Sequence, residues 1–165
     1  VGKGINGGRL IVVPPAGVKD PGNQVILGNT CLYGATGGEL YALGRAGERF
    51  AVRNSGCKAV VEGAGDHCCE YMTGGVVVVL GSTGRNVAAG MTGGIAFILD
   101  EDAGLAQRVN QEIVAIEPIS NSEQEALLKS LLEGHLEATG SAKAAALLAD
   151  WPSWKQRFKV LVTPS

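Results

Sequence analysis

The fold of this chain is decided by Tyr71-Met-Thr-Gly-Gly75-Val-Val-Val-Val-Leu80 and Gly90-Met-Thr-Gly-Gly94-Ile-Ala-Phe-Ile-Leu99. In each stretch a double glycine runs directly into a short apolar segment. The same arrangement occurs at Gly7-Gly8 and at Gly37-Gly38, so the chain holds four copies. Recurrence of a short unit along a chain indicates stacked structural repeats.

The spacing of the copies indicates how many repeats there are. The second glycines stand at positions 8, 38, 75 and 94. The first two intervals are nearly double the third, and the apolar runs Val25–Leu27 and Ala59–Val61 fall midway in them. We therefore predict six repeats, at roughly 15-residue steps early and roughly 19-residue steps later.

Each run is short, rich in Val, Ile and Leu and bounded by glycine, which predicts a strand. No helix of a dozen residues fits between runs in the first hundred positions, which excludes alternating strands and helices there. The linkers of ten residues or more are too long for hairpin turns. The pattern thus favours a mainly β fold, a single-stranded parallel β-helix (solenoid) whose six laps stack to about 29 Å. Parallel crossovers in general favour the right-handed sense, but left-handed coils exist and the repeat alone leaves the hand open.

Glycine supplies the corners of such a coil because it reaches positive φ without steric cost. We assign structural turn roles to Gly7, Gly8, Gly37, Gly38, Gly74, Gly75, Gly93 and Gly94. Asn6, Thr36, Thr73 and Thr92 precede the double glycines and should lie in register at one edge. Their side chains either satisfy local backbone groups or are simply small enough for a turn.

The chain becomes helical after Pro118. Ser122-Glu-Gln-Glu125 has the form of a capping box, and Leu128, Leu131, Leu132, His135 and Leu136 trace one apolar face. Gly140 should end this helix, and Ser141 should cap a second one that runs through Ala149. We expect Trp151, Trp154 and Phe158 to anchor this tail on the solenoid.

These elements predict a single domain over residues 1–165, with a glycine-repeat β-helix at 1–117 and a helical C-terminal cap at 118–165. A shorter helix around Leu105–Gln111 is also compatible with the pattern. The chain opens Val1-Gly2-Lys3-Gly4 without an initiator methionine, so we expect it to be cut from a longer polypeptide. Its first strand has no cap ahead of it, and the uncovered edge favours self-association.

Composition excludes several classes of partner. The net charge is −2 and only 18% of the residues are charged, so neither nucleic acid nor an anionic membrane is expected. No apolar run approaches the length of about 20 residues that spans a membrane.

The sequence offers few candidates for chemistry. Gly2-Lys-Gly4-Ile-Asn-Gly7 matches a dinucleotide fingerprint, but it precedes a strand at 9–13 instead of opening a helix. The cysteines lack Cys-x-x-Cys spacing, which favours buried thiols over a metal or redox site: Cys31, Cys57, Cys68 and Cys69.

Polar residues gather before the third double glycine. Glu62, Asp66, His67 and Glu70 are interpreted as a solvated corner, and His67 could share one side of an extended segment with Cys69, opposite Cys68. His135 is interpreted as a hydrogen-bonded core histidine. We therefore assign no catalytic, cofactor-binding or metal-binding residue in this chain.

Several motifs resemble a known family. They are Arg53-Asn-Ser-Gly56, Val60-Val-Glu-Gly63, Gly65-Asp-His67, Cys69-Glu-Tyr-Met-Thr-Gly-Gly75, Gly84-Arg-Asn86 and Ala89-Gly-Met-Thr-Gly-Gly-Ile95, joined in the tail by Arg108-Val-Asn110, His135, Thr139-Gly-Ser141 and Trp151. Together they resemble the C-terminal domain of the glutamate synthase large subunit, which is often named for its Gly-x-Gly-x-Gly repeats. The resemblance covers essentially the whole chain. Glycine is expected where Cys68 stands; if that corner needs positive φ, either Cys68 is strained or the turn is rearranged.

The resemblance implies a right-handed β-helix domain of an oxidoreductase that makes two glutamates from glutamine, 2-oxoglutarate and reductant. An amidotransferase domain releases ammonia, which travels inside the protein to an FMN-bearing barrel. Electrons arrive through iron–sulfur centres from ferredoxin or from a nicotinamide-dependent subunit. The catalytic cysteine, the FMN and the iron–sulfur cluster all belong to other domains of that family.

The expected role of this domain is therefore mechanical. It would hold the amidotransferase and FMN-barrel domains in register and contribute to the wall of the ammonia tunnel, in the cytoplasm or, for a plant-type parent, in a plastid. A free-standing acyltransferase on a left-handed coil is disfavoured because a six-residue period and a histidine base are missing. A separately encoded β-helix subunit, acting as an interaction module in a related oxidoreductase complex, stays open as the alternative.

Overall fold

The computed structural model describes residues 2–14, 24–100, 104–105, 109, 114–119 and 121–162. Within these ranges seven strands form one sheet in the order β1-β3-β5-β6-β7-β9-β8. The first five are mutually parallel, and they are β1 (Asn6–Val12), β3 (Gly37–Ala42), β5 (Lys58–Val61), β6 (Thr73–Val79) and β7 (Gly93–Leu99). This is a parallel β-solenoid of about four turns, and the predicted fold class is confirmed.

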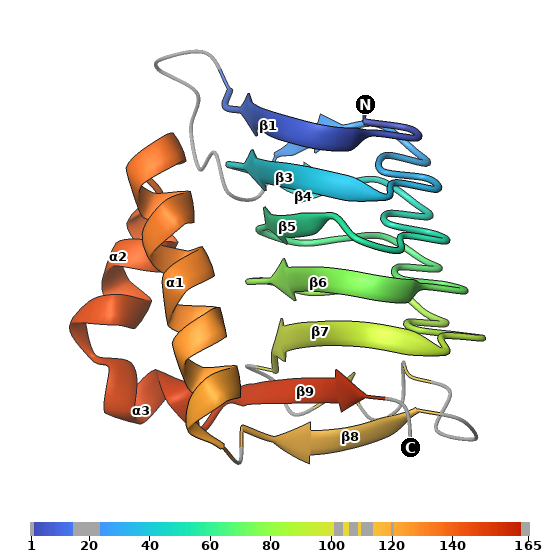
Figure 1. The fold of residues 1–165 in the computed structure, drawn as a ribbon. Helices are drawn as coiled ribbons and strands as arrows, with labels where there is room; N and C mark the ends of the chain where they lie inside the picture. The colour runs from blue at the N-terminus through green and yellow to red at the C-terminus, as the bar shows by residue number, and fades with distance from the viewer. Residues whose placement is uncertain are drawn as a thin grey trace.

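The handedness follows from the path of the chain between these strands. Figure 1 shows the chain running along the main sheet, passing behind it and returning one strand further on, in a right-handed sense. Parallel crossovers prefer this sense because of the right-handed twist of strands.

The laps have a nearly constant length. In the ladder Glu39 pairs with Lys58, Lys58 with Val76 and Val76 with Ile95, so successive partners are separated by almost the same length of chain. The first lap is longer, because Arg9 pairs with Glu39, 30 residues on.

The prediction of six laps is wrong at Val25–Leu27. This segment is β2, and it pairs in parallel with β4 (Arg45–Ala46) in a second, two-stranded sheet. It therefore belongs to the return path of the first lap and does not form a lap of its own. Only Leu27 at its end is buried in the interior of the coil, whereas Val25 is 66% exposed.

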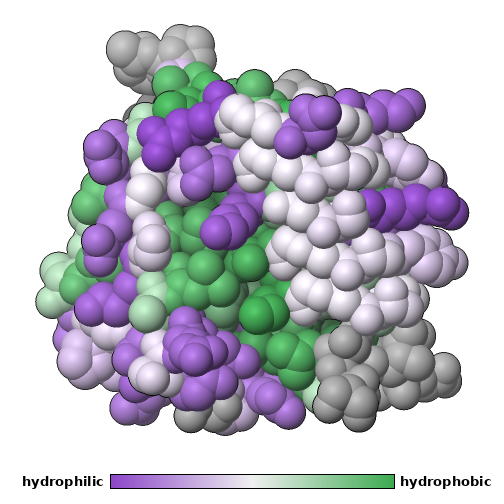
Figure 2. Space-filling model, in the orientation of Figure 1, coloured by the Kyte–Doolittle hydropathy of each residue, from purple (hydrophilic) through white to green (hydrophobic). Residues whose placement is uncertain are grey.

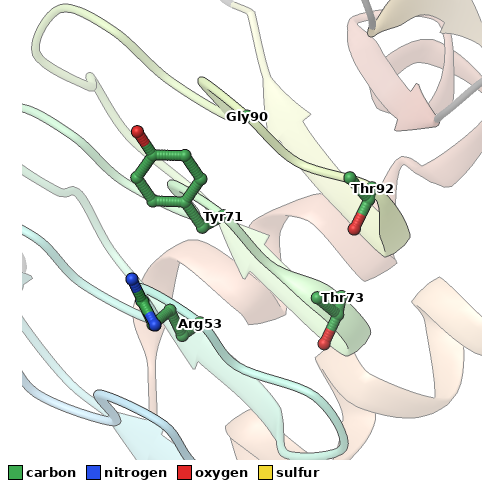
Figure 3. A pocket seen from close by; sticks show the side chains of 5 residues that line it. All are labelled: Arg53, Tyr71, Thr73, Gly90 and Thr92. Carbon is green, nitrogen blue, oxygen red and sulfur yellow. The ribbon is translucent and has the colours of Figure 1, made fainter.

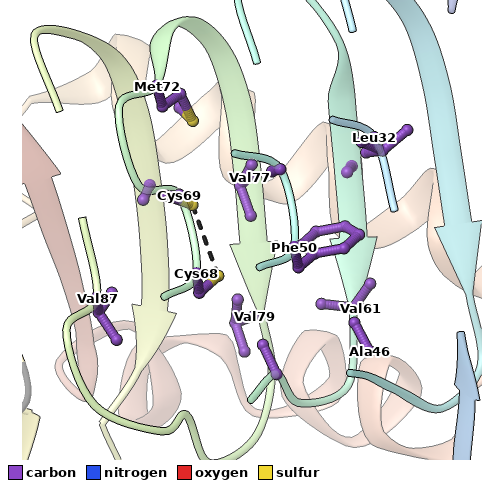
Figure 4. Packing of buried hydrophobic residues seen from close by; sticks show 14 of the residues in the cluster. Leu32, Ala46, Phe50, Val61, Cys68, Cys69, Met72, Val77, Val79 and Val87 are labelled. Carbon is purple, nitrogen blue, oxygen red and sulfur yellow. Dashed lines mark hydrogen bonds between the residues drawn. The ribbon is translucent and has the colours of Figure 1, made fainter. Parts of the chain in front are cut away.

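Alternate residues of each main-sheet strand pack into two different cores. Val77 and Val79 point into the coil, where they meet Phe50 and Met72 of the neighbouring laps (Figure 4). Val76, Val78 and their equivalents face outward into a second cluster. A strand buried on both faces reads as a continuous apolar run, which explains the valine repeat.

The C-terminal segment covers the outward face. It contains β8 (Ala115–Pro118), α1 (Ser122–Thr139), α2 (Ala142–Ala149), α3 (Trp151–Lys155) and β9 (Phe158–Val162). Leu128 and Leu132 of α1 lie in the outer cluster with Phe97 of β7. Figure 1 shows α1 running along the stack of strands, beside their carboxyl ends.

Strands β8 and β9 were missed in the sequence. β9 pairs antiparallel with both β7 and β8, so the tail extends the sheet beyond the last lap. Phe158 was expected only as an anchor and is the first residue of β9, fully buried. The candidate helix at 105–111 lies largely outside the described residues.

The helix ends agree with the sequence except at one position. Gly140, at φ 70°, ends α1, and the Ser141 side chain caps α2 by accepting a hydrogen bond from the Ala144 amide, as predicted. The cap of α1 is Asn121 and not Ser122, because the Asn121 side chain accepts from the Gln124 amide at 2.8 Å. The capping-box pattern was therefore placed one residue too late.

The two glycines of each pair have different geometry. The second of each pair, Gly8, Gly38, Gly75 and Gly94, has φ between 82° and 88°. The first lies against the preceding lap, and a Cβ on Gly93 would stand 2.2 Å from the Thr73 carbonyl oxygen. Figure 2 shows the resulting glycine- and threonine-rich corners as a pale ridge at the right of the molecule.

Within the described residues β1 pairs with β3 alone, so its other edge is uncovered. Ile11 on this strand is 46% exposed. The structure describes no helix long and apolar enough to cross a membrane.

Candidate functional site

Each lap reaches the main sheet through a corner in which every second residue has positive φ. Arg49, Ala51 and Arg53 form one such corner, at 60°, 60° and 57°. Equivalent residues recur in the other laps, so that ten of the described non-glycine residues have positive φ: Thr30, Leu32, Arg49, Ala51, Arg53, His67, Cys69, Tyr71, Asn86 and Ala88. A non-glycine residue in this conformation costs about 1–2 kcal/mol. Hydrogen bonds between laps offset the cost.

These bonds stack equivalent residues into rows. The Arg53 amide donates to the Glu70 carbonyl at 3.0 Å, and the Tyr71 amide donates to the Ala89 carbonyl at 2.8 Å. Arg53, Tyr71 and Gly90 therefore follow one another in one row, a lap apart. In the adjacent row the Thr73 amide donates to the Asn54 carbonyl, and the Thr92 amide donates to the Met72 carbonyl. Thr73 and Thr92 thus lie in register, as predicted for the residues that precede the double glycines.

The two rows enclose a shallow depression of about 390 Å³ (Figure 3). It is lined by Arg53, Tyr71, Thr73, Gly90 and Thr92. The Arg53 guanidinium lies 5.9 Å from the centroid of the Tyr71 ring, and Tyr71 is 51% exposed. The ring lies against Gly90, where a Cβ would stand 2.4 Å from it and would displace it from this position.

This depression can bind an anionic oxygen group. A guanidinium presents parallel N–H donors that match a carboxylate or a phosphate, and the neighbouring threonine hydroxyls add further polar groups. No carboxylate in the described part of the chain forms an ion pair with Arg53. In the sequence Arg53 and Tyr71 were noted only as members of the motifs that resemble a known family. They are one whole lap apart, and this spacing is the signal that could have predicted their contact.

A second cluster of polar side chains is buried between the solenoid and the helices. Glu62 accepts hydrogen bonds on Oε2 from His135 Nε2 at 2.9 Å and from Ser141 Oγ at 2.7 Å. His135 and Ser141 are fully buried and Glu62 is 8% exposed. The interpretation of His135 as a hydrogen-bonded core residue is confirmed, whereas the placement of Glu62 in a solvated corner is wrong.

This cluster joins elements but has no catalytic arrangement. A serine nucleophile needs an adjacent general base, most often a histidine. Here Ser141 donates to the carboxylate of Glu62, and His135 contacts that carboxylate instead of the serine. Because that carboxylate oxygen accepts from Ser141, we assign the proton of the His135 ring to Nε2. Among the described residues His135 Nδ1 has no hydrogen-bond partner, although it is buried. The three side chains tie the end of β5 to α1 and to the start of α2.

The adjacent cysteines lie inside the coil. Cys68 and Cys69 are both fully buried, with their sulfurs 3.6 Å apart (Figure 4). Opposite faces were expected only for an extended segment, and strain at Cys68 only for a positive φ at this residue; neither condition holds. Positive φ falls on His67 and Cys69, so the segment is not extended and Cys68 keeps an ordinary backbone.

The thiols are poor nucleophiles and poor metal ligands in this setting. The hydrogen bond with Cys68 raises the pKa of the Cys69 thiol well above its ordinary value, and burial raises it further. Burial, with a contribution from the charge of Glu39, raises the pKa of the Cys57 thiol to about 11. Reactivity and metal binding both require the thiolate, which is scarce at neutral pH when the pKa is high.

The remaining polar residues do lie at an exposed corner. His67 Nδ1 and Glu70 Oε2 are 2.7 Å apart and both side chains are partly exposed. Asp66 Oδ1 accepts from the Arg85 amide at 2.8 Å, one lap on. Across the described ranges no group of three or more His, Cys, Asp or Glu residues could hold a metal ion.

The dinucleotide-like glycines occupy a different context from the one that this motif requires. Gly2 and Gly4 have φ of 72° and 70°, and Gly7 lies within β1. The segment thus leads into a strand, as expected, and offers no helix N-terminus to a pyrophosphate.

Known proteins similar to this chain are glutamate synthases. The chain is 60% identical over 166 residues to ferredoxin-dependent glutamate synthase 2 of Synechocystis sp., covering 100% of the chain and 11% of that protein. It is 58% identical over 169 residues to the chloroplastic ferredoxin-dependent glutamate synthase of Spinacia oleracea, covering 100% of the chain and 10% of that protein. It is 53% identical over 163 residues to the NADH glutamate synthase of Schizosaccharomyces pombe, covering 98% of the chain and 8% of that protein.

The chain therefore spans about a tenth of the length of these relatives. The sequence model of the GXGXG motif family matches residues 1–165, from one end to the other. On this match the chain belongs to the GXGXG motif family.

Proposed function

We propose that this chain is a bracing domain of a glutamate synthase large subunit. The parent enzyme would convert glutamine, 2-oxoglutarate and reductant into two glutamates. The brace would hold the amidotransferase and FMN-barrel domains at a fixed separation and form part of the ammonia tunnel wall. The similarity over the whole chain to relatives with that name supports this parent.

The observation that carries the bracing role is the continuous bonding between laps. Main-chain hydrogen bonds link each lap to the next at the strands and again at the corners. Arg45 adds a side-chain link across two laps, with Nη1 2.8 Å from Ser82 Oγ. Such a stack resists bending, and a misplacement of about 1 Å between reacting groups can cost about a hundredfold in rate.

The cofactors of the parent would be bound elsewhere. An iron–sulfur cluster needs several converging thiolates, and the four thiols here are buried with no such convergence among the described residues. FMN needs a deep pocket, and the corner depression is too shallow for it. Electrons would come from ferredoxin or from a nicotinamide-dependent partner, in the cytoplasm or in a plastid.

The bracing role is tested in the complete enzyme with Gly75→Val and Gly94→Val. Both positions have positive φ, and a Cβ on Gly75 would stand 2.5 Å from the Cys57 carbonyl oxygen. We expect more glutamine to be hydrolysed than is accounted for by glutamate, with ammonia released into solution. Gly8→Val is the matched control, because Gly8 also has positive φ, at 82°, but a Cβ there meets nothing within 4 Å.

Folding of the variants is checked by their flavin spectrum and by thermal unfolding. If the folded variants keep the stoichiometry of the two half-reactions, the brace is wrong. If Gly75→Val does not fold, the milder Gly93→Ala replaces it, because its clash is confined to one carbonyl group.

A further inference from the structure

Arg53 and Tyr71 belong to the motifs that carry the family resemblance, yet neither side chain packs into a core. Both are exposed at the corner ridge, where Arg53 lies over the Tyr71 ring. The ridge lies at the opposite ends of the strands from α1 and α2, so neither helix covers it (Figure 1). Packing therefore leaves these two side chains unexplained.

We propose that the depression around Arg53 and Tyr71 is where the solenoid docks onto a neighbouring domain of its parent polypeptide. The occupant is an aspartate or glutamate side chain of that domain. This inference rests on the proposed function, since it names the surface through which the brace is attached.

Charge and geometry select a carboxylate. Arg53 lacks an acidic partner in the described part of the chain, and its fork of N–H donors matches a carboxylate in two parallel hydrogen bonds. The Thr73 side chain lines the same depression beside it (Figure 3). The ring of Tyr71 lies 5.9 Å from the guanidinium on one side, and the ring itself lies against Gly90.

The shape selects a protein partner over a free small molecule. Sites for small ligands enclose most of the ligand surface, whereas this depression of about 390 Å³ opens along a convex ridge. Tyrosine and arginine are among the residues most enriched at the centres of protein interfaces. A side chain held in place before binding also loses less entropy on docking.

The relatives supply a source for the partner. The chain spans about a tenth of their length, so a much larger part of such a polypeptide is available to contact the ridge. An acidic side chain presented by it would neutralise Arg53 at the centre of the contact.

The test uses the complete enzyme and an arginine-specific reagent, phenylglyoxal. Arg49 is the internal control, because it is an exposed arginine in the same corner with the same backbone conformation, at φ 60° against 57°. We expect Arg53 to be modified at least tenfold more slowly than Arg49, as measured by peptide mass spectrometry. Equal rates for the two arginines would overturn the docking surface.

Charge reversal provides the second arm. Arg53→Glu should release ammonia and lower the yield of glutamate per glutamine, whereas Arg49→Glu should leave both unchanged. If Arg53→Glu leaves the yield unchanged and phenylglyoxal reaches Arg53 freely, the docking proposal fails while Gly94→Val still tests the brace. If Arg53 is protected but the glycine variants stay coupled, the docking surface stands and the brace fails.

A free dicarboxylate is excluded or identified by the same assay. Protection of Arg53 that appears only after 2-oxoglutarate or glutamate is added would assign the depression to a small molecule and overturn the proposal. Protection that is present without either compound supports a domain contact.

Discussion

The glycine that begins a double pair is required by the lap next to it, as at Gly37, Gly74 and Gly93, and not by its own backbone angle. Gly7 and Gly93 occupy equivalent positions in the repeat, and neither has positive φ. A Cβ on Gly93 would meet the Thr73 carbonyl oxygen at 2.2 Å, whereas a Cβ on Gly7 would meet nothing within 4 Å. The difference arises because Gly7 lies in the first described lap.

We therefore expect Gly93→Ala to lower the free energy of unfolding by about 1–3 kcal/mol, because a main-chain carbonyl cannot move aside cheaply. Gly7→Ala should change it by less than about 0.5 kcal/mol. Urea unfolding of the isolated chain followed by circular dichroism measures both. Equal effects of the two substitutions would contradict the role assigned to the contact between laps.

A buried thiol should make the fold sensitive to alkali. The pKa of Cys57 is raised from 9.0 to about 11, so the folded state favours the protonated form. The protonated Cys57 thiol therefore contributes fully to stability below about pH 9, and this contribution is lost as the pH rises towards about 11. The loss in the free energy of unfolding is on the order of 2 kcal/mol. Between about pH 9 and about pH 11 the stability of Cys57→Ala should therefore fall less than that of the unsubstituted chain, as measured by urea unfolding at each pH. Parallel curves for the two proteins would contradict this.

The sequence predicted where the corners lie, but not which residues make them. Glycine was expected to supply the positive φ, and the second glycine of each pair does have it. Leu32, Ala51 and Ala88 have it too, although nothing in a leucine or an alanine indicates such a conformation. It becomes favourable only when the neighbouring laps bond to the same segment, as in the bond from the Ala51 amide to the Cys31 carbonyl. These hydrogen bonds join residues about one lap apart, so the sequence around each corner does not predict its backbone conformation.

At the scale of elements, the buried carboxylate of Glu62 is the main polar link between the coil and the helices. Removing its donor should be costly, because an uncompensated buried charge is left behind. We expect His135→Leu to lower the stability by about 3–5 kcal/mol. The double variant Glu62→Leu/His135→Leu should recover a large part of this loss, and a double-mutant cycle measures the coupling. Strict additivity of the two single changes would show that the contact contributes little.

The start of α1 allows a direct comparison of two adjacent polar residues. Asn121→Ala should lower the stability by about 1 kcal/mol, since it removes the side-chain oxygen that accepts from the Gln124 amide. Ser122→Ala should have an effect below about 0.5 kcal/mol. Thermal unfolding of both variants decides between them, and a larger effect at Ser122 would restore the cap predicted from the sequence.

The elements of the tail were predictable only in part. Gly140 and Ser141 carry strong local signals, and both act as expected. β8 and β9 carry none, because a few apolar residues next to helices fit either a strand or a buried helical turn. β9 can pair antiparallel with β7 only because the chain reverses its direction after the last lap. The glycine repeat ends before this reversal and therefore could not predict it.

On the scale of the whole molecule, α1 links laps that otherwise bond only to their neighbours. Its 18 residues extend about 27 Å, longer than the four strand spacings from β1 to β7, which amount to about 19 Å. It contacts β1, β3 and β5 directly and shares a core with Phe97 of β7. Repeat proteins without such a strut can unfold lap by lap.

We expect the chain to unfold in one cooperative step. Both tryptophans, Trp151 and Trp154, lie in α3, so their fluorescence reports on the helical tail, while far-ultraviolet circular dichroism includes the sheet. The two urea transitions should coincide. Separate midpoints would show that the tail detaches before the coil melts.

The candidate site shows the same limit on prediction at this scale. Thr73 and Thr92 could be placed in one row because each precedes a double glycine. Arg53 and Tyr71 were not joined from the sequence, although they stand about one predicted late lap apart, because neither belongs to the double glycine that marks the register of each lap. The early laps were predicted too short, since β2 was counted as a lap.

The constant lap restricts how natural variants of this protein can change in size. An added or deleted segment as long as one lap keeps every later side chain on the same face of the sheet. This is because each later strand then pairs in the same register with a neighbour one lap away. A segment of any other length cannot join the ladder in register, so it has to lie outside the paired strands between two laps. Natural variants should therefore differ in length either by whole laps or by insertions at the same few positions between laps.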